Sequence, residues 1–233
     1  MPEVLSLAIE TSCRRGQVCL GRGEAVLETA TFPAGQRHAV QLIPRLDELL
    51  RSRGYRPCDV SEVYVSAGPG SFTGLRVGIT VARTLCQAVS GIRCVGVPTM
   101  SAVAQNATGA DFVNLGVLMA AKEESVFLGL FDRRQGDTQP VSEPKLVACE
   151  RLPEELPRPV LLIGEALEYC RPAGDGISVG DEALWLPQAV EVWRIGRKLA
   201  SQGRYTPYQQ LTPVYVREPE AVRLWEKRGH PAR

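Results

Sequence analysis

Apolar and polar residues alternate or recur at helical spacing along the first part of the chain. Short apolar runs joined by glycine-containing turns predict three strands in an antiparallel meander, at Val4–Ile9, Gln17–Leu20 and Ala25–Thr31. An apolar stripe then predicts a helix over residues 38–53, in which Pro44 predicts a kink or a later start. The pattern next predicts a strand, a helix, a strand and a short helix at Glu62–Ser66, Gly74–Ser90, Arg93–Val97 and Thr99–Gln105.

A second series of elements begins after Gly109. It predicts strands at Phe112–Met119, Ser125–Phe131 and Val160–Ile163, one or two more strands over Pro140–Ala148, a polar turn at Arg133–Asp137 and a helix over Gln188–Gln202. Both series place strands first and then a helix and a strand, although no sequence identity links them. We therefore predict an α/β protein with two related lobes, residues 1–108 and 109–233, of which the second is less regular.

The segment Gly68-Pro69-Gly70-Ser71-Phe72-Thr73-Gly74-Leu75-Arg76 connects the predicted strand to the predicted helix. It lacks the Gly-Lys-Ser/Thr ending of a P-loop and the third glycine of a dinucleotide fingerprint. Glycines permit sharp turns and close approach of a neighbour, and Ser71 or Thr73 is placed to cap the helix. The loop is either a tight packing turn or a site for an anion or ligand.

The composition is that of an ordinary globular protein. The 233 residues are 44% hydrophobic and 23% charged, which suits one large domain or two of about 110 residues each. The net charge of +1 argues against binding nucleic acid by bulk electrostatics. The N-terminal apolar run is too short for a secretory signal, and no run approaches the roughly 20 apolar residues of a membrane span. The 7 cysteines contain no Cys-x-x-Cys pair, which indicates reduced thiols in the cytoplasm.

Few residues have the chemistry of a catalytic or metal site. Glu10, at the end of the first strand, either holds a metal–nucleotide complex or is a solvated turn acid bonded to Thr11 or Ser12. We favour the second interpretation because no second carboxylate for Mg²⁺ is identifiable. Histidine occurs only at His38 and in the C-terminal tail, so a nucleophilic triad would depend on one of them. We therefore assign no catalytic residue and no metal ligand.

Scattered basic residues are candidates for contact with RNA, but a solvated loop is the simpler interpretation. They are Arg14, Arg15, Lys122, Arg133 and Arg134. In the tail, acids and bases alternate after Arg217, which is typical of a solvated helix or a frayed end. Tyr215 and Arg217 either dock the C-terminus onto the body or bind a partner.

Three segments together resemble one protein family. They are Leu7-Ala8-Ile9-Glu10-Thr11-Ser12, Gly68-Pro69-Gly70-Ser71-Phe72-Thr73-Gly74-Leu75-Arg76-Val77-Gly78 and Pro213-Val214-Tyr215-Val216-Arg217. They resemble the opening turn, the signature loop and helix, and the C-terminal motif of the TsaB (YeaZ) family of tRNA threonylcarbamoyladenosine biosynthesis. Two positions depart from that pattern, because Glu10 replaces an aspartate and Ala120-Ala121-Lys122 replaces Asp-Ala-Arg.

The resemblance implies the duplicated α/β fold of actin-like, Hsp70-like and sugar-kinase-like proteins (the ASKHA, ribonuclease H-like architecture), with a degenerate second lobe. It also implies a non-catalytic scaffold or activator that pairs with the catalytic paralogue TsaD and the ATPase TsaE. These proteins move threonylcarbamoyl onto the adenosine beside the tRNA anticodon, so that this chain would contact tRNA through the complex. The paralogue binds metal through His-x-x-x-His, and here Leu42 stands four residues after His38.

The family's partner surface lies on the two first-lobe helices, here about 38–53 and 74–90, which would pack as a four-helix interface. The same helices would pair two free copies into a homodimer. We expect no firmly bound cofactor, and the partner interface is the candidate place for an ATP or ADP. The implied site comprises Glu10, Thr11, Ser12, His38, Gly68, Gly70, Ser71, Thr73, Gly74, Arg76 and Gly78. We expect a bulky residue at Gly74 to abolish partner binding while the isolated chain stays folded.

Two alternatives from other functional classes stay open. The first is an ATP-binding phosphotransferase or ATPase of the same superfold, motivated by the turn at Glu10 and the glycine-rich helix start. The second is a self-associating interaction module built on the same two helices.

Overall fold

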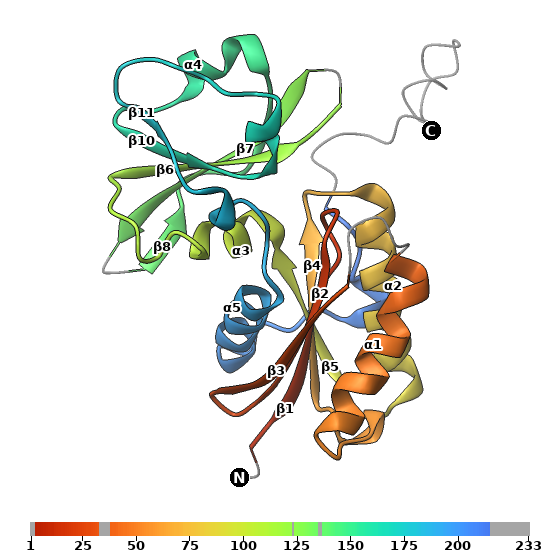
Figure 1. The fold of residues 1–233 in the computed structure, drawn as a ribbon. Helices are drawn as coiled ribbons and strands as arrows, with labels where there is room; N and C mark the ends of the chain where they lie inside the picture. Colours follow the sequence, from red (N-terminus) through yellow and green to blue (C-terminus); the bar gives the residue numbers. More distant parts are fainter. Residues whose placement is uncertain (1–2, 33–37, 123, 135–136, 215–233) are drawn as a thin grey trace, which may run out of the picture.

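The computed structural model describes residues 3–32, 38–122, 124–134 and 137–214, which form two lobes around two β-sheets (Figure 1). The first sheet contains β1 (Leu5–Glu10), β2 (Gly16–Arg22), β3 (Ala25–Phe32), β4 (Glu62–Gly68) and β5 (Arg93–Pro98) in the order β3-β2-β1-β4-β5. The first three strands form the predicted antiparallel meander, and β4 and β5 run parallel to β1.

Helices cover both faces of the first sheet. On one face lie α1 (His38–Ser52) and α2 (Phe72–Ala88), and on the other lies α5 (Ala189–Ser201) (Figure 1). Successive residues of a strand point to opposite faces, so Leu7 and Ile9 pack under α1 and α2, whereas Ala8 packs under α5. Because both faces are buried, β1 is apolar almost throughout.

The second sheet repeats the strand order of the first. Its strands are β6 (Asn114–Ala120), β7 (Ser125–Arg134), β8 (Asp137–Pro140), β9 (Lys145–Ala148), β10 (Val160–Ile163) and β11 (Ile177–Val179), in the order β8-β7-β6-β10-β11 with β9 also paired to β7. An antiparallel meander again precedes two strands parallel to its first member. The fold is therefore the expected duplicated ribonuclease H-like, actin-like architecture.

The second sheet lacks long crossover helices in the described part of the chain. Where the first sheet has α1 and α2, the described segments between the second-sheet strands hold only α4 (Leu152–Glu155) and short 3₁₀ turns, among them η3 (Glu165–Glu168). The helix α3 (Thr99–Gln105) joins the lobes, because Met100 and Val103 belong to the second-lobe core while Ala102 packs with α5. The second lobe is therefore less regular than the first, as predicted from the sequence.

Three details differ from expectation. The second helix begins at Phe72, two residues early, whereas α1 begins at His38 as predicted and contains Pro44. Arg133 and Arg134 extend β7 where we expected a turn. The helix α5 packs on β1, β2, β4 and β5, so the last part of the predicted second lobe returns to the first sheet. Tyr215, Arg217 and the rest of the tail lie outside the described residues.

Candidate functional site

The turn after β1 and the loop after β4 meet in one buried cluster. Because β1 and β4 are parallel neighbours, their carboxyl ends lie at the same edge of the sheet. The turn residues Glu10, Thr11 and Ser12 are all buried there. The structure therefore brings together most of the site residues expected from the sequence, although they are about 60 residues apart along the chain.

The glycines of the loop allow this close packing. A Cβ atom on Gly70 would lie 2.6 Å from the Ser12 carbonyl oxygen, and a Cβ on Gly74 or Gly78 would overlap Thr11. In return, the Ser71 N–H donates to the Ser12 carbonyl at 2.6 Å, and Thr11 Oγ1 donates to the Gly74 carbonyl at 2.8 Å. This geometry favours the interpretation of the loop as a packing turn.

Ser71 is the N-cap of α2, since its Oγ accepts the Gly74 N–H at 3.3 Å. Thr73, the alternative cap, is exposed in the first turn of the helix. A large side chain at Gly74 would have to displace the Thr11 main chain. The geometry therefore argues against our expectation that such a variant keeps its fold.

Glu10 is completely buried, so the prediction of a solvated acid is wrong, although its predicted bond to Ser12 is present. Its carboxylate accepts the Ser12 N–H at 2.6 Å, the Ser12 hydroxyl at 2.5 Å and the Ser66 hydroxyl. Burial raises the pKa of Glu10 above its ordinary value, and these hydrogen bonds offset part of that rise. The carboxylate thus joins β1 to β4 inside the protein.

Glu165, a buried carboxylate from the second lobe, was missed from the sequence. It begins η3 directly after Gly164, the residue that follows the end of β10 at Ile163. Burial raises its pKa, and its charge adds to the rise in the pKa of Glu10. The available signal was its position, since it follows a buried strand and a glycine much as Pro69 follows β4. Among the described residues, no three His, Cys, Asp or Glu side chains are grouped to hold a metal ion.

A polar cavity of about 680 Å³ lies beside Glu165. Its lining includes Arg15, Gln17, Glu168 and Arg171, so both signs of charge face it. Next to it, an ion pair between Arg14 of the first lobe and Glu168 of the second crosses between the lobes. Of the basic residues considered for RNA contact, Arg14 is thus engaged within the protein.

Arg133 also has an internal role. Its guanidinium donates to the Thr108 and Ala110 carbonyls at 3.0 Å each, and it stacks over Phe112 at 4.6 Å. It therefore holds the segment after α3 in place. The side chain of Arg134 lies outside the described residues.

Apolar side chains are exposed on both α1 and α2. Val40 and Ile43, which are 63% and 61% exposed, lie on one side of α1 because residues three apart in a helix are neighbours. Phe72 of α2 is 43% exposed, and the Arg76 guanidinium stacks 3.8 Å from its ring centre. We call Val40, Ile43, Phe72 and Arg76 the α1–α2 surface. The side chain of His38, at the start of α1, lies outside the described residues.

No helix within the described ranges has both the length and the apolar character needed to cross a bilayer.

Comparison with known proteins places the chain in a family. Residues 33–172 match the family TsaD, tRNA N6-adenosine threonylcarbamoyltransferase. The tRNA threonylcarbamoyladenosine biosynthesis protein TsaB of Bacillus subtilis is 26% identical over 94% of this chain and 96% of its own length, and that of Escherichia coli is 27% identical over 95% and 96%. The solved structure of YeaZ from Pseudomonas aeruginosa, 22% identical, has the same fold with a TM-score of 0.79 over 91% of this chain and 99% of its own. The chain therefore belongs to the family that the TsaD match defines, in its TsaB (YeaZ) branch.

Proposed function

We propose that this chain is a non-catalytic subunit of the machinery that makes threonylcarbamoyladenosine in tRNA, and that it binds a TsaD-like catalytic paralogue. The observation that carries the proposal is the α1–α2 surface on a chain of the TsaB branch. Exposed apolar area costs about 25 cal/mol per Å², and association recovers that free energy. Two helices from each chain would form a four-helix interface that buries Val40 and Ile43.

The buried cluster shapes this surface rather than performing chemistry. Thr11 and Ser12 bond to Gly74 and Ser71, at the start of α2, so they fix where that helix begins. The Glu10 carboxylate is occupied by serine donors and turned inward. It therefore does not fit the role of a ligand to a metal–nucleotide complex. A TsaE-like ATPase would join the complex, and tRNA would be contacted through it.

The proposal is tested with Val40→Asp and Ile43→Glu in the full chain. Val113→Glu is the matched control, because Val113 is 66% exposed and lies just before β6 in the other lobe. Each variant is co-purified with the TsaD-like paralogue from the same host. Each is also expressed in a host that lacks the gene, and hydrolysed tRNA is analysed for the threonylcarbamoyl nucleoside.

We expect Ile43→Glu to weaken binding of the paralogue at least about tenfold, since one buried charge at an apolar interface costs more than about 1.4 kcal/mol. The nucleoside should fall with it, while Val113→Glu behaves as the parent. Undiminished binding by both α1 variants would remove the α1–α2 surface from the function. Formation of the nucleoside by the purified chain alone would show that it is an enzyme.

The same surface favours a second role, self-association of the free chain. An isologous pairing would place the Ile43 side chains of two copies together. We expect a dimer in sedimentation experiments on the isolated chain, with Ile43→Glu monomeric and the paralogue converting dimer to heterodimer. A dimer that persists in Ile43→Glu would place self-association elsewhere.

A further inference from the structure

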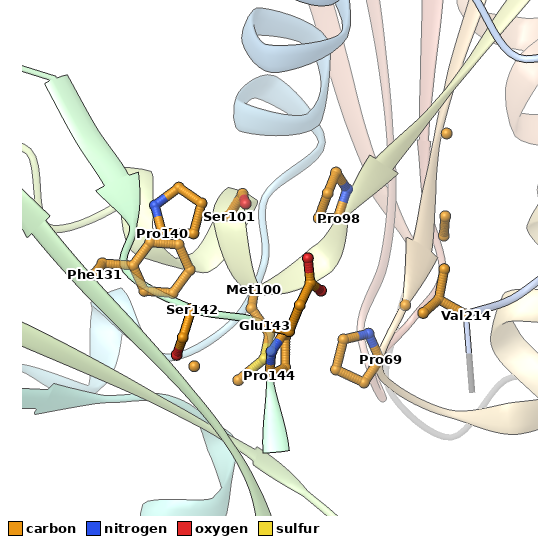
Figure 2. Close-up of a pocket in the computed structure, with 14 residues that line it drawn as sticks. Pro69, Pro98, Met100, Ser101, Phe131, Pro140, Ser142, Glu143, Pro144 and Val214 are labelled. Atoms are coloured by element: carbon orange, nitrogen blue, oxygen red, sulfur yellow. The ribbon is translucent and has the colours of Figure 1, made fainter. Parts of the chain in front are cut away.

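A second cavity, largely apolar, lies between the lobes beside the carboxyl ends of β4 and β5. Its volume is about 440 Å³. Pro69 and Pro98 face it from the first lobe, Phe131 and Pro140 from the second, and Met100 from α3 (Figure 2). Apolar cavities with few polar groups are typical binding places for a ligand or a peptide segment.

An interruption in the second sheet forms part of the cavity wall. The third strand of the first meander, β3, is continuous, whereas its counterpart is divided into β8 and β9. The residues between them include Ser142, Glu143 and Pro144, which line the cavity. Figure 2 shows the Glu143 carboxylate directed toward the first-lobe wall. Among the described residues that line the cavity, Glu143 is the only charged one.

The described part of the chain ends on the opposite wall. The Val214 N–H donates to the Ala67 carbonyl at 2.7 Å, which attaches the chain to the end of β4. The Val214 carbonyl crosses over Gly68, where a Cβ atom would lie 2.7 Å from it. Gly68 therefore leaves room for the chain to pass into the cavity region. The sequence continues from here with Tyr215-Val216-Arg217 and ends at Arg233.

We propose that the segment beginning Tyr215-Val216-Arg217 docks in this cavity, that Arg217 pairs with Glu143, and that the segment thereby ties the two lobes together. Extended chain spans about 3.3 Å per residue, so Arg217 reaches roughly 10 Å beyond Val214. A segment tethered at the cavity wall has an effective concentration near the millimolar range, well above that of free peptides. The tail also carries more basic than acidic residues, which complements Glu143.

A charge exchange in the full chain tests this proposal. The variants are Arg217→Glu, Glu143→Arg and the double exchange, with Arg223→Glu as the matched control on a neighbouring tail arginine. Amide hydrogen exchange is followed in peptides that cover residues 94–105 and 139–147, on both walls of the cavity. These readouts involve no partner protein, so they stand independently of the proposed function.

We expect each single variant to accelerate exchange on both walls about fivefold, the equivalent of about 1 kcal/mol. The double exchange should restore the parent rates, and Arg223→Glu should leave them unchanged. Equal rates in the parent and both single variants, or an equal effect of Arg223→Glu, would overturn the pairing. Protection that rises with protein concentration would show that a second copy fills the cavity, which would overturn intramolecular docking.

Discussion

Thr11, the residue after β1, packs directly against Gly74 in the first turn of α2. Thr11 Oγ1 donates to the Gly74 carbonyl at 2.8 Å, and a Cβ atom on Gly74 would overlap the Thr11 carbonyl oxygen. The contact joins the buried cluster to the helix that carries Phe72 and Arg76. The loop at residues 68–76 thus positions the start of α2 through main-chain packing.

Gly74→Val should destabilise the protein by about 3 kcal/mol, because the added side chain must displace the main chain of the β1 turn. The free energy of unfolding is measured by urea denaturation. Gly109→Ala is the control, since nothing lies within 4 Å of its Cβ position, and it should change the stability by less than about 0.5 kcal/mol. Parent stability for Gly74→Val would show that this contact is dispensable.

Glu10→Gln should make the stability of the protein less dependent on pH. The pKa of Glu10 is raised in the folded state by burial, with the neighbouring Glu165 carboxylate contributing. The folded protein therefore holds the proton more tightly than the unfolded chain. The contribution of this proton to the free energy of unfolding is fully present at pH values below the pKa of Glu10 in the unfolded chain. It is lost as the pH rises through the pKa of Glu10 in the folded protein.

Urea denaturation from pH 4 to pH 8 measures this effect. The parent should lose up to about 1.4 kcal/mol per pH unit between the two pKa values of Glu10 relative to Glu10→Gln. Burial also raises the pKa of Glu165, and the charge of Glu165 acts on Glu10. Glu165→Gln is therefore the companion variant. Parallel pH profiles for the parent and Glu10→Gln would contradict a raised pKa at Glu10.

Trp193→Ala should destabilise the first lobe by about 4 kcal/mol, since it removes the largest buried side chain that α5 places on the sheet. The indole packs over Gly21, and its Nε1 donates to Ser6 Oγ at 2.8 Å. Trp193→Phe keeps most of the apolar contact and should cost less. Denaturation followed by circular dichroism ranks the variants, and equal losses for both would mean that the hydrogen bond matters more than the packing.

Isothermal calorimetry with Mg-ATP should show no binding tighter than about 100 μM to the isolated chain. The physical reason is that the Glu10 carboxylate is buried and bonded to serines. A nucleotide at the partner interface would require residues of the TsaD-like chain, so the titration is repeated on the complex. Binding near 1 μM with turnover by the isolated chain would favour the phosphotransferase alternative.

Local sequence patterns were sufficient to predict most of the elements and the first meander. Hydrophobic residues recur every two residues in a strand and every 3.6 residues in a helix, and both periods depend only on neighbours along the chain. The predicted bounds therefore lie within two residues of the observed ones for β1, β4, α2 and α3. The repeated series of elements predicted two lobes, and the family resemblance predicted their duplicated ribonuclease H-like architecture, which the repeated strand order confirms.

Contacts between distant segments were decided only by the tertiary structure. Glu10 accepts a hydrogen bond from Ser66 of β4, and Glu165, the carboxylate whose charge adds to the rise in the pKa of Glu10, comes from the other lobe. Likewise, α5 packs on the first sheet through Trp193, whose indole N–H donates to the Ser6 hydroxyl of β1. Periodicity shows which face of an element is apolar, but not which remote element covers it. That choice is made by the packing of the whole chain.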